Sequence, residues 1–236
     1  MRLYFNGCSH TYGDDLDQPA TQSWPALIAA HQGCDYVNDA VSGNANDNII
    51  YQTIRNAHQF DKIYIAWTYI ERFTRYRFDN NYVVNFNPQL TNRLYGKDSS
   101  FVDYGRIHYT VWYNNLFSFK QWLQNIILLQ RYLESCQKPY VMVNSDNNLI
   151  DRWSAAWPDF VSSVQSLLCF DFMNDDQLYQ EYQEIQSLLS QINFDHYIGW
   201  NVWWLTKDSF ATGVTGHYLS SGHEHIAKYI LKHDTN

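Results

Sequence analysis

The sequence predicts an α/β fold in which helices cover both faces of a parallel sheet, giving three layers. The main observation is a unit of strand, turn and helix that recurs along the first part of the chain. Residues 62–67 form a mostly apolar run, which is typical of a parallel strand covered on both faces. We expect about four or five strands, a usual sheet size, with the functional site at their carboxyl edge.

The amino-terminal part supplies three of these strands. Residues 3–5 are apolar or aromatic and too few for a helix, so they indicate a strand, and residues 36–38 and 62–67 indicate two more. Between the first two lies a helix with Ser23 as N-cap, Pro25 in its first turn and Gly33 as C-cap. A second helix is expected over about residues 47–59, before the third strand.

The remainder of the chain is less regular. Residues 70–115 are polar, tyrosine-rich and without a clear period, and are interpreted as an insertion or lid over the strand ends. A helix is predicted over residues 116–134, a fourth strand over 138–144, a helix over 175–191 and a last helix from 220 or 221 to 232. The aromatic residues 198–205 receive no assignment. One domain, 1–236, is the simplest organisation.

Composition excludes several functional classes. The net charge is −8 and the 16 Lys and Arg form no basic run, so neither nucleic acid nor an anionic membrane is an expected partner. Four scattered cysteines without a CxxC pair argue against a zinc module and a disulfide scaffold. A strand starting at residue 2 or 3 leaves no room for a signal peptide, and no apolar run approaches the roughly 20 residues of a membrane span. We expect a soluble cytoplasmic protein with no cofactor and no metal.

Aromatic content is high, with 9 Trp, 19 Tyr and 13 Phe. These rings either fill the core or line a groove that stacks on sugar faces, and composition alone does not separate the two.

The segment Asn6-Gly7-Cys8-Ser9-His10-Thr11-Tyr12-Gly13 follows the first strand. Glycine near each end lets the chain leave a strand, turn sharply and present one side chain at the top of a sheet. Ser9 is that side chain, and acyl transfer by serine needs such a nucleophile together with a base and donors for the oxyanion.

Two segments resemble blocks of the SGNH (GDSL-type) hydrolases. Residues 7–13 resemble the first block, a Gly-x-Ser-x-Thr-x-Gly pattern around the serine nucleophile. Residues 216–223 resemble the last block, in which a catalytic histidine, here His217, is followed six residues later by a second, here His223. The resemblance implies a flavodoxin-like sheet, Ser9 as nucleophile and His217 as general base. We expect His223 to cap or pack against the last helix and His225 to be solvated.

The residue that orients the base is a departure from the family. The family places an Asp three residues before the histidine, where this chain has Val214. Asp208 is the nearest upstream carboxylate and is the predicted third member, reaching in by a longer loop. A backbone carbonyl in its place, or a Ser-His dyad, are the alternatives.

The oxyanion hole is partly matched. In the family it comes from the serine's own amide, a glycine amide and an Asn side chain. Ser9 and Gly43 match the first two, but Thr68 follows the third strand where the Asn is expected. Thr68 or Asn46 is predicted to supply the missing donor.

Three other interpretations use neighbouring residues. Cys8 is an alternative nucleophile, although beside an inward-pointing Ser9 it is expected to pack as a small hydrophobe. Zinc held by the histidines lacks an i, i+4 pair or an HExxH pattern. Glu71 and Arg72 are expected to form an ordinary ion pair at a helix start, the alternative being that they bind substrate.

The resemblance implies a serine esterase or acylhydrolase. The polar insertion and acidic composition favour a small-molecule or glycan ester carrying a short acyl group over a long-chain lipid. The alternatives are a non-catalytic carbohydrate-binding or interaction protein with the same fold, and a thioesterase or phospholipid acylhydrolase that prefers longer acyl chains.

Overall fold

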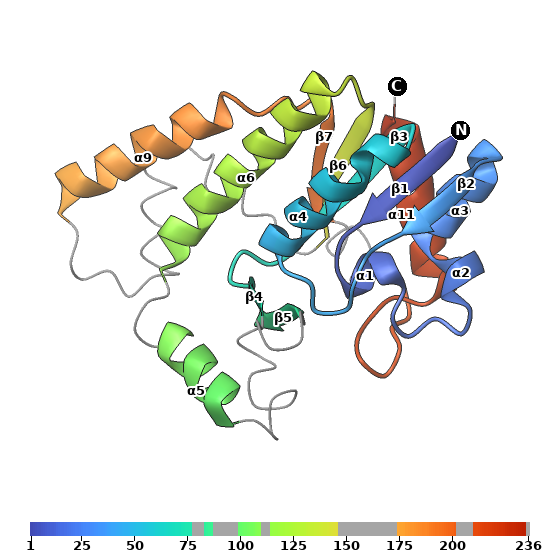
Figure 1. The fold of residues 1–236 in the computed structure, drawn as a ribbon, viewed down its shortest axis with the longest axis horizontal. Coiled ribbons are helices and arrows are strands. Elements are labelled where there is room, and N and C mark those ends of the chain that lie inside the picture. The colour runs from blue at the N-terminus through green and yellow to red at the C-terminus, as the bar shows by residue number, and fades with distance from the viewer. Residues whose placement is uncertain (77–82, 87–98, 110–113, 146–173, 202–209, 235–236) are drawn as a thin grey trace.

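The computed structural model describes residues 1–76, 83–86, 99–109, 114–145, 174–201 and 210–234. Its central sheet has five strands in the order β2-β1-β3-β6-β7, and every neighbouring pair is parallel (Figure 1). The strands are β1 (Arg2–Asn6), β2 (Asp35–Asn38), β3 (Lys62–Trp67), β6 (Tyr140–Asn144) and β7 (Tyr197–Asn201). This confirms the predicted α/β class. The strand order is that of flavodoxin-like sheets, in which the second strand lies on one side of the first and the later strands are added on its other side.

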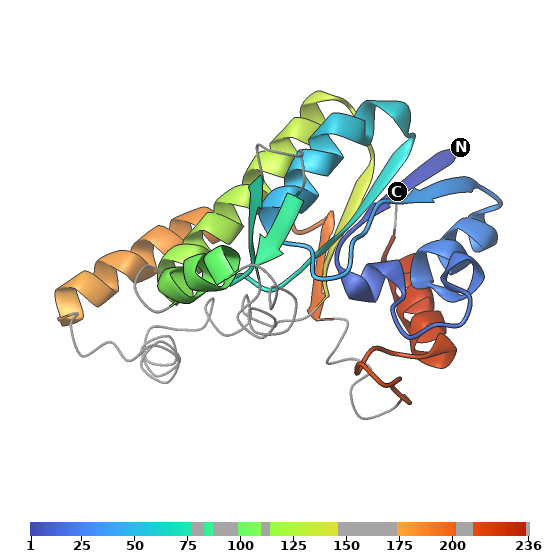
Figure 2. The ribbon, with the colours of Figure 1, turned by 60° about the horizontal axis from the view of Figure 1, so that its bottom comes forward.

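Helices cover both faces of the sheet and complete the three layers (Figures 1 and 2). One layer contains α3 (Trp24–Gln32) and α11 (Ser220–His233), with the short α1 (Ser9–Tyr12) and α2 (Pro19–Gln22) beside them. The other contains α4 (Asn46–Asn56), α6 (Asn115–Ser135) and α9 (Asp175–Leu189).

Alternation along the strands builds two separate cores. Leu3 and Phe5 pack with α3 and α11, whereas Tyr4, between them, packs with α4 and α6. All six residues of β3 are buried, as its apolar run predicted. Many of the aromatic rings lie within these cores. For these buried rings, the interpretation that aromatic residues fill the core is therefore supported.

Helix boundaries mostly follow the sequence signals. Gly33 ends α3 in the left-handed conformation with φ 62°, as expected of a C-cap glycine. Ser23 occupies the N-cap position, but its hydroxyl makes no capping bond. The predicted helix over 47–59 is α4 followed by one turn of 3-10 helix, η1 (Ala57–Gln59).

The described parts of the 70–115 insertion are ordered elements. β4 (Phe73–Tyr76) and β5 (Val83–Phe86) form an antiparallel hairpin, and α5 (Ser99–Ile107) follows. Part of the unassigned aromatic stretch is β7, the fifth strand, which pairs with β6 at the edge of the sheet. None of the helices in the described ranges combines the length and apolar content that crossing a bilayer requires.

Candidate active site

Ser9 lies at the first position of α1, directly beyond the carboxyl end of β1. Its side chain is 6% exposed. The one-turn helix is held by amides of Thr11 and Tyr12 that donate to the Cys8 carbonyl, and Gly13 ends it with φ 95°. Gly7 permits the tight entry, because a Cβ there would lie 2.9 Å from the Cβ of Thr11. The turn therefore presents Ser9 at the carboxyl edge of the sheet, as predicted.

Asparagines brace this turn from both sides. The Asn44 side chain donates to the Gly7 carbonyl (3.0 Å), and the Asn6 side chain accepts from the Gly7 amide (2.8 Å). Asn44 also accepts from the side chain of Asn48 (2.7 Å). These buried amide contacts fix the backbone that carries Ser9, because breaking one leaves a buried polar group without a partner.

His217 lies beside the residue that follows Ser9. The ring centroids of His10 and His217 are 4.7 Å apart, so the loop before α11 returns to the turn at residue 9. No hydrogen bond to the Ser9 hydroxyl occurs within the described ranges. The structure thus brings His217 to the correct edge of the sheet without a formed Ser-His hydrogen bond, and such bonds often tighten only when substrate binds.

A carboxylate that the sequence analysis missed lies next to His217. Asp15 Oδ2 accepts from the Thr215 amide (2.9 Å), the Thr215 hydroxyl (2.7 Å) and the His217 amide (3.2 Å). The Thr215 oxygen is 2.8 Å from His217 Nδ1, and Asp15 Oδ2 is 3.7 Å from the same nitrogen. Because the Thr215 hydroxyl donates to Asp15, it is left to accept from Nδ1–H, which places the basic lone pair of the ring on Nε2.

The backbone around Asp15 is built for this approach. Asp15 adopts a left-handed conformation with φ 66°. Gly213 faces it so closely that a Cβ would lie 2.7 Å from Asp15 Oδ2. Burial acts to raise the pKa of Asp15, but the hydrogen bonds from Thr215 and His217 outweigh it and hold the pKa below its ordinary value. Asp15 is therefore a charged acceptor for the loop that carries the base.

Two further histidines near His217 are neutral: His10 is partly buried and His223 is fully buried. Burial lowers the pKa of His10 to about 3, and the charges of His217 and Arg72 add to this. Burial, followed by His217, lowers the pKa of His223 to about 4. His223 Nδ1 accepts from the Trp24 amide (3.1 Å), so it joins the starts of α11 and α3, which confirms its predicted packing role. His225 is exposed, as expected.

The other sequence candidates are placed as follows. Asp208 lies outside the described residues. Val214 is fully exposed at the tip of the turn before His217 and has no contact with the site. Cys8 is completely buried and lies 3.5 Å from the Ser145 hydroxyl, which fits its expected role as a packed side chain.

The predicted oxyanion residues surround the ends of β1 and β3. Gly43 sits on a turn with φ 74°, and neither its amide nor that of Ser9 donates a hydrogen bond in the described part of the chain. Asn46 donates to the carbonyls of Thr68 and Tyr69 and accepts from the Thr68 amide, so its side chain secures the end of β3. The Thr68 oxygen accepts from Arg72 and keeps its own proton for donation.

Glu71 and Arg72 do not form the expected ion pair. Their charged atoms make no contact within 4 Å, and they precede strand β4 instead of a helix. Arg72 donates to the Thr68 hydroxyl (2.8 Å) and lies over the Tyr69 ring (4.7 Å). Burial raises the pKa of Glu71. The prediction of an ordinary pair at a helix start is wrong because the Arg72 guanidinium binds Thr68 and Tyr69 instead, while the Glu71 carboxyl accepts from its own backbone amide.

Metal ligation has no support among the described residues, since no three His, Cys, Asp or Glu side chains gather to hold an ion. No protein-family model matches the sequence, and no curated protein matches it.

Solved structures do match the fold. A protein of the G-D-S-L family from Desulfitobacterium hafniense DCB-2 matches with 11% identity and a TM-score of 0.47, covering 98% of each chain. A catalytic mutant of an acetylxylan esterase from Geobacillus stearothermophilus matches over 100% of this chain and 94% of that one, with 11% identity and a TM-score of 0.49. A carbohydrate esterase family 2 enzyme with a carbohydrate-binding domain, from Corynascus thermopiles (Myceliophthora fergusii), matches over 98% and 66%, with 13% identity and a TM-score of 0.48. The chain is similar to all three over nearly its whole length.

Proposed function

We propose that this chain is a serine esterase that removes a short acyl group from a carbohydrate. The observation that carries the proposal is the arrangement around His217. Its Nδ1 is bonded to Thr215 and, through it, to the carboxylate of Asp15, while its ring lies against the residue next to Ser9. An oriented imidazole beside a serine at a sharp turn is the machinery of acyl transfer.

The reaction proceeds in two halves. Ser9 Oγ attacks the acyl carbonyl carbon while His217 Nε2 accepts the serine proton. The amides of Ser9 and Gly43, with the Thr68 hydroxyl, donate to the oxyanion. The C–O bond to the alcohol then breaks, and His217 returns the proton to the leaving oxygen. Water attacks the acyl-enzyme with His217 again as base, which releases the acid and restores Ser9.

Asp15 takes the role that the sequence analysis gave to Asp208. It holds the loop of His217 by three hydrogen bonds and stabilises the imidazolium through Thr215. The role of Asp208 stays a prediction. Comparing Asp15→Asn with Asp208→Asn in ester turnover distinguishes the two, because only the orienting carboxylate should lower kcat strongly.

Fluorophosphonate labelling tests the mechanism directly. The label should appear on Ser9 by peptide mass spectrometry, and both Ser9→Ala and His217→Ala should abolish it together with acetyl-ester turnover. Cys8→Ala is the matched control, since the Cys8 thiol next to Ser9 is buried and its loss should not affect the label. No label on Ser9 in a folded protein would contradict the mechanism, and a label lost in Cys8→Ala would point to the thiol.

The absence of a formed Ser9–His217 hydrogen bond favours one alternative, a carbohydrate-binding protein of the same fold without catalysis. Such a protein would bind a glycan equally well with and without the Ser9 hydroxyl and would turn over no ester. Binding and turnover measured on wild type and Ser9→Ala therefore separate the two functions.

A further inference from the structure

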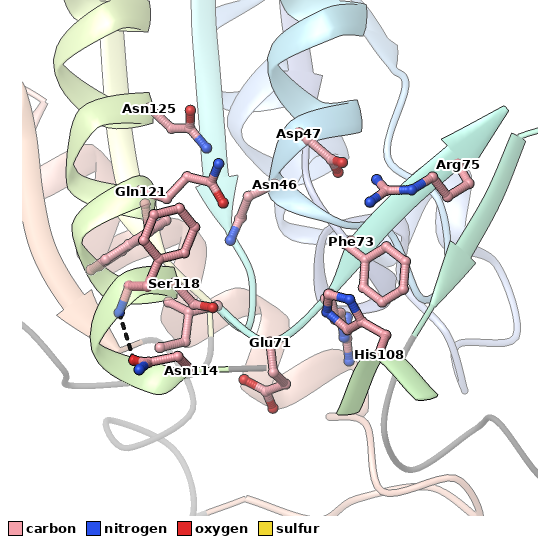
Figure 3. Close-up of a pocket in the computed structure, with 14 residues that line it drawn as sticks. Asn46, Asp47, Glu71, Phe73, Arg75, His108, Asn114, Ser118, Gln121 and Asn125 are labelled. Carbon is pink, nitrogen blue, oxygen red and sulfur yellow. Dashed lines mark hydrogen bonds between the residues drawn. The ribbon is translucent and has the colours of Figure 1, made fainter. Parts of the chain in front are cut away.

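A cavity of about 370 Å³ lies beside the candidate active site, among α4, α6, β4, the segment between β3 and β4, and the residue that follows α5 (Figure 3). This volume is within the range of small-molecule sites. Two residues connect it to the site: Asn46 and Arg72 line the cavity and also bind the backbone or hydroxyl of Thr68. The cavity therefore adjoins Thr68, one of the predicted oxyanion residues, at the end of β3.

Its wall is mainly polar. Ten of the fourteen lining side chains are polar or charged. From α6 come Ser118, Gln121 and Asn125, whose spacing of three and four places them on one face of the helix. The amides of Gln121 and Asn125 extend toward α4 in Figure 3, and neither makes a hydrogen bond within the described ranges.

Buried donors in the same wall also lack acceptors. The indole N–H of Trp122, a residue only 2% exposed, and the Nε of Arg72 are covered from solvent and have no hydrogen-bond partner among the described residues. Because neither atom is accessible from the cavity, the polar groups that a ligand can reach are the amides of Gln121 and Asn125 on α6. These two amides form a surface of hydrogen-bond donors and acceptors that has no partner in the described part of the chain.

Charge defines the kind of ligand. Two carboxylates, Asp47 and Glu71, and two guanidinium groups, Arg72 and Arg75, line the cavity, so the fixed charges cancel. The arginines are also engaged, Arg72 with Thr68 and Arg75 with the Thr74 carbonyl. An anion such as phosphate would meet both carboxylates, and a long acyl chain would bury the amides without partners. A neutral group with many hydroxyls avoids repulsion by the carboxylates and provides hydrogen-bond partners for the amides.

We infer that this cavity binds a sugar ring, the part of the proposed ester substrate that carries the acyl group. Gln121 and Asn125 donate to and accept from its hydroxyls, Glu71 accepts from them, and the exposed ring of Phe117 at the wall offers an apolar face. The inference rests on the proposed function for the position of the acyl group, but the binding itself does not require catalysis.

The test measures binding apart from chemistry. Ser9→Ala protein is titrated with the methyl glycosides of glucose, xylose, galactose and N-acetylglucosamine by NMR. At least one should shift backbone amide resonances of α6 and of residues 70–73. In this background, Gln121→Ala and Asn125→Ala should each weaken binding about 5-fold, as expected for the loss of one hydrogen bond. Gln124→Ala, on the exposed side of the same helix, is the matched control and should leave binding unchanged.

The outcomes separate this inference from the proposed function. Binding of no glycoside, or binding that Gln121→Ala and Asn125→Ala do not weaken, overturns the sugar site even if wild type hydrolyses an aryl acetate. Shifts at α6 caused by inorganic phosphate or hexanoate and not by any glycoside overturn it in favour of another ligand class. Glycoside binding at α6 with no esterase activity in wild type supports the site and refutes only the proposed catalysis.

Discussion

Acidification from about pH 7 to about pH 5 should remove a large part of the stability of this protein. Burial lowers the pKa of His10 to about 3 and of His223 to about 4, whereas an unfolded histidine has a pKa of about 6.5. Below about pH 6.5 the unfolded chain therefore binds two protons that the folded chain does not. The free energy of unfolding falls as pH decreases through this window, until the folded pKa values are reached.

The magnitude follows from these two values. At about pH 5, protonation of each histidine stabilises the unfolded state by about 2 kcal/mol. The reason is that the pH lies about 1.5 units below the unfolded pKa and one unit corresponds to about 1.4 kcal/mol. Both together give a loss of about 4 kcal/mol, against a typical total of about 5–15 kcal/mol. Urea unfolding followed by tryptophan fluorescence at the two pH values measures it.

Variants identify the groups responsible. His223→Asn keeps an acceptor for the Trp24 amide and removes one titrating ring, so the loss should shrink to about 2 kcal/mol. His58→Asn changes an exposed histidine and should retain the full loss. Equal stability of wild type at both pH values, or a full loss in His223→Asn, would refute the assignment of His10 and His223 as neutral in the folded protein.

Three other predictions concern the site and its supports. Asp15→Asn should lower kcat for an acetyl ester about 100-fold with little change in KM, because the amide no longer stabilises the imidazolium through Thr215; an unchanged kcat would exclude Asp15 as the orienting residue. Gly213→Ala should lower kcat similarly without touching the carboxylate, since its Cβ would displace Asp15, and a crystal structure should show the two separated. Asn46→Ala should reduce the free energy of unfolding by about 3 kcal/mol in urea denaturation, because the amide and carbonyl of Thr68 lose their partner; a loss below about 1 kcal/mol would contradict its structural role.

The sequence was informative about the fold where local signals agreed. The apolar run of β3 and the glycine at the end of α3 predicted their elements because burial on two faces and a left-handed cap are local requirements. β7 received no assignment because its five residues include Gly199 and Asn201 and show no clear alternation of apolar and polar side chains.

The site was predictable only in part. Ser9 and His217 stand in recognisable local patterns, but Asp15 lies in a polar loop next to another aspartate, and nothing nearby marks it. Its partner Thr215 is 200 residues away, so the contact depends on the whole sheet and on the docking of α11. Glu71 and Arg72 are the opposite case. They are adjacent in sequence, which suggested an ion pair, but in the turn before β4 their charged groups do not pair.

This long separation also determines when the site comes into existence. Asp15 is synthesised 200 residues before Thr215, and His217 follows just before α11, so a nascent chain that already contains all five strands still lacks the base. Helix α11 packs on α3 and on the sheet, and it is fastened by the His223–Trp24 hydrogen bond and the Lys62–Asp234 ion pair. Local opening of this one helix would remove the imidazole while the strands stay paired. Activity would then report the docking of the last helix, and partial denaturation should abolish turnover before it melts the sheet.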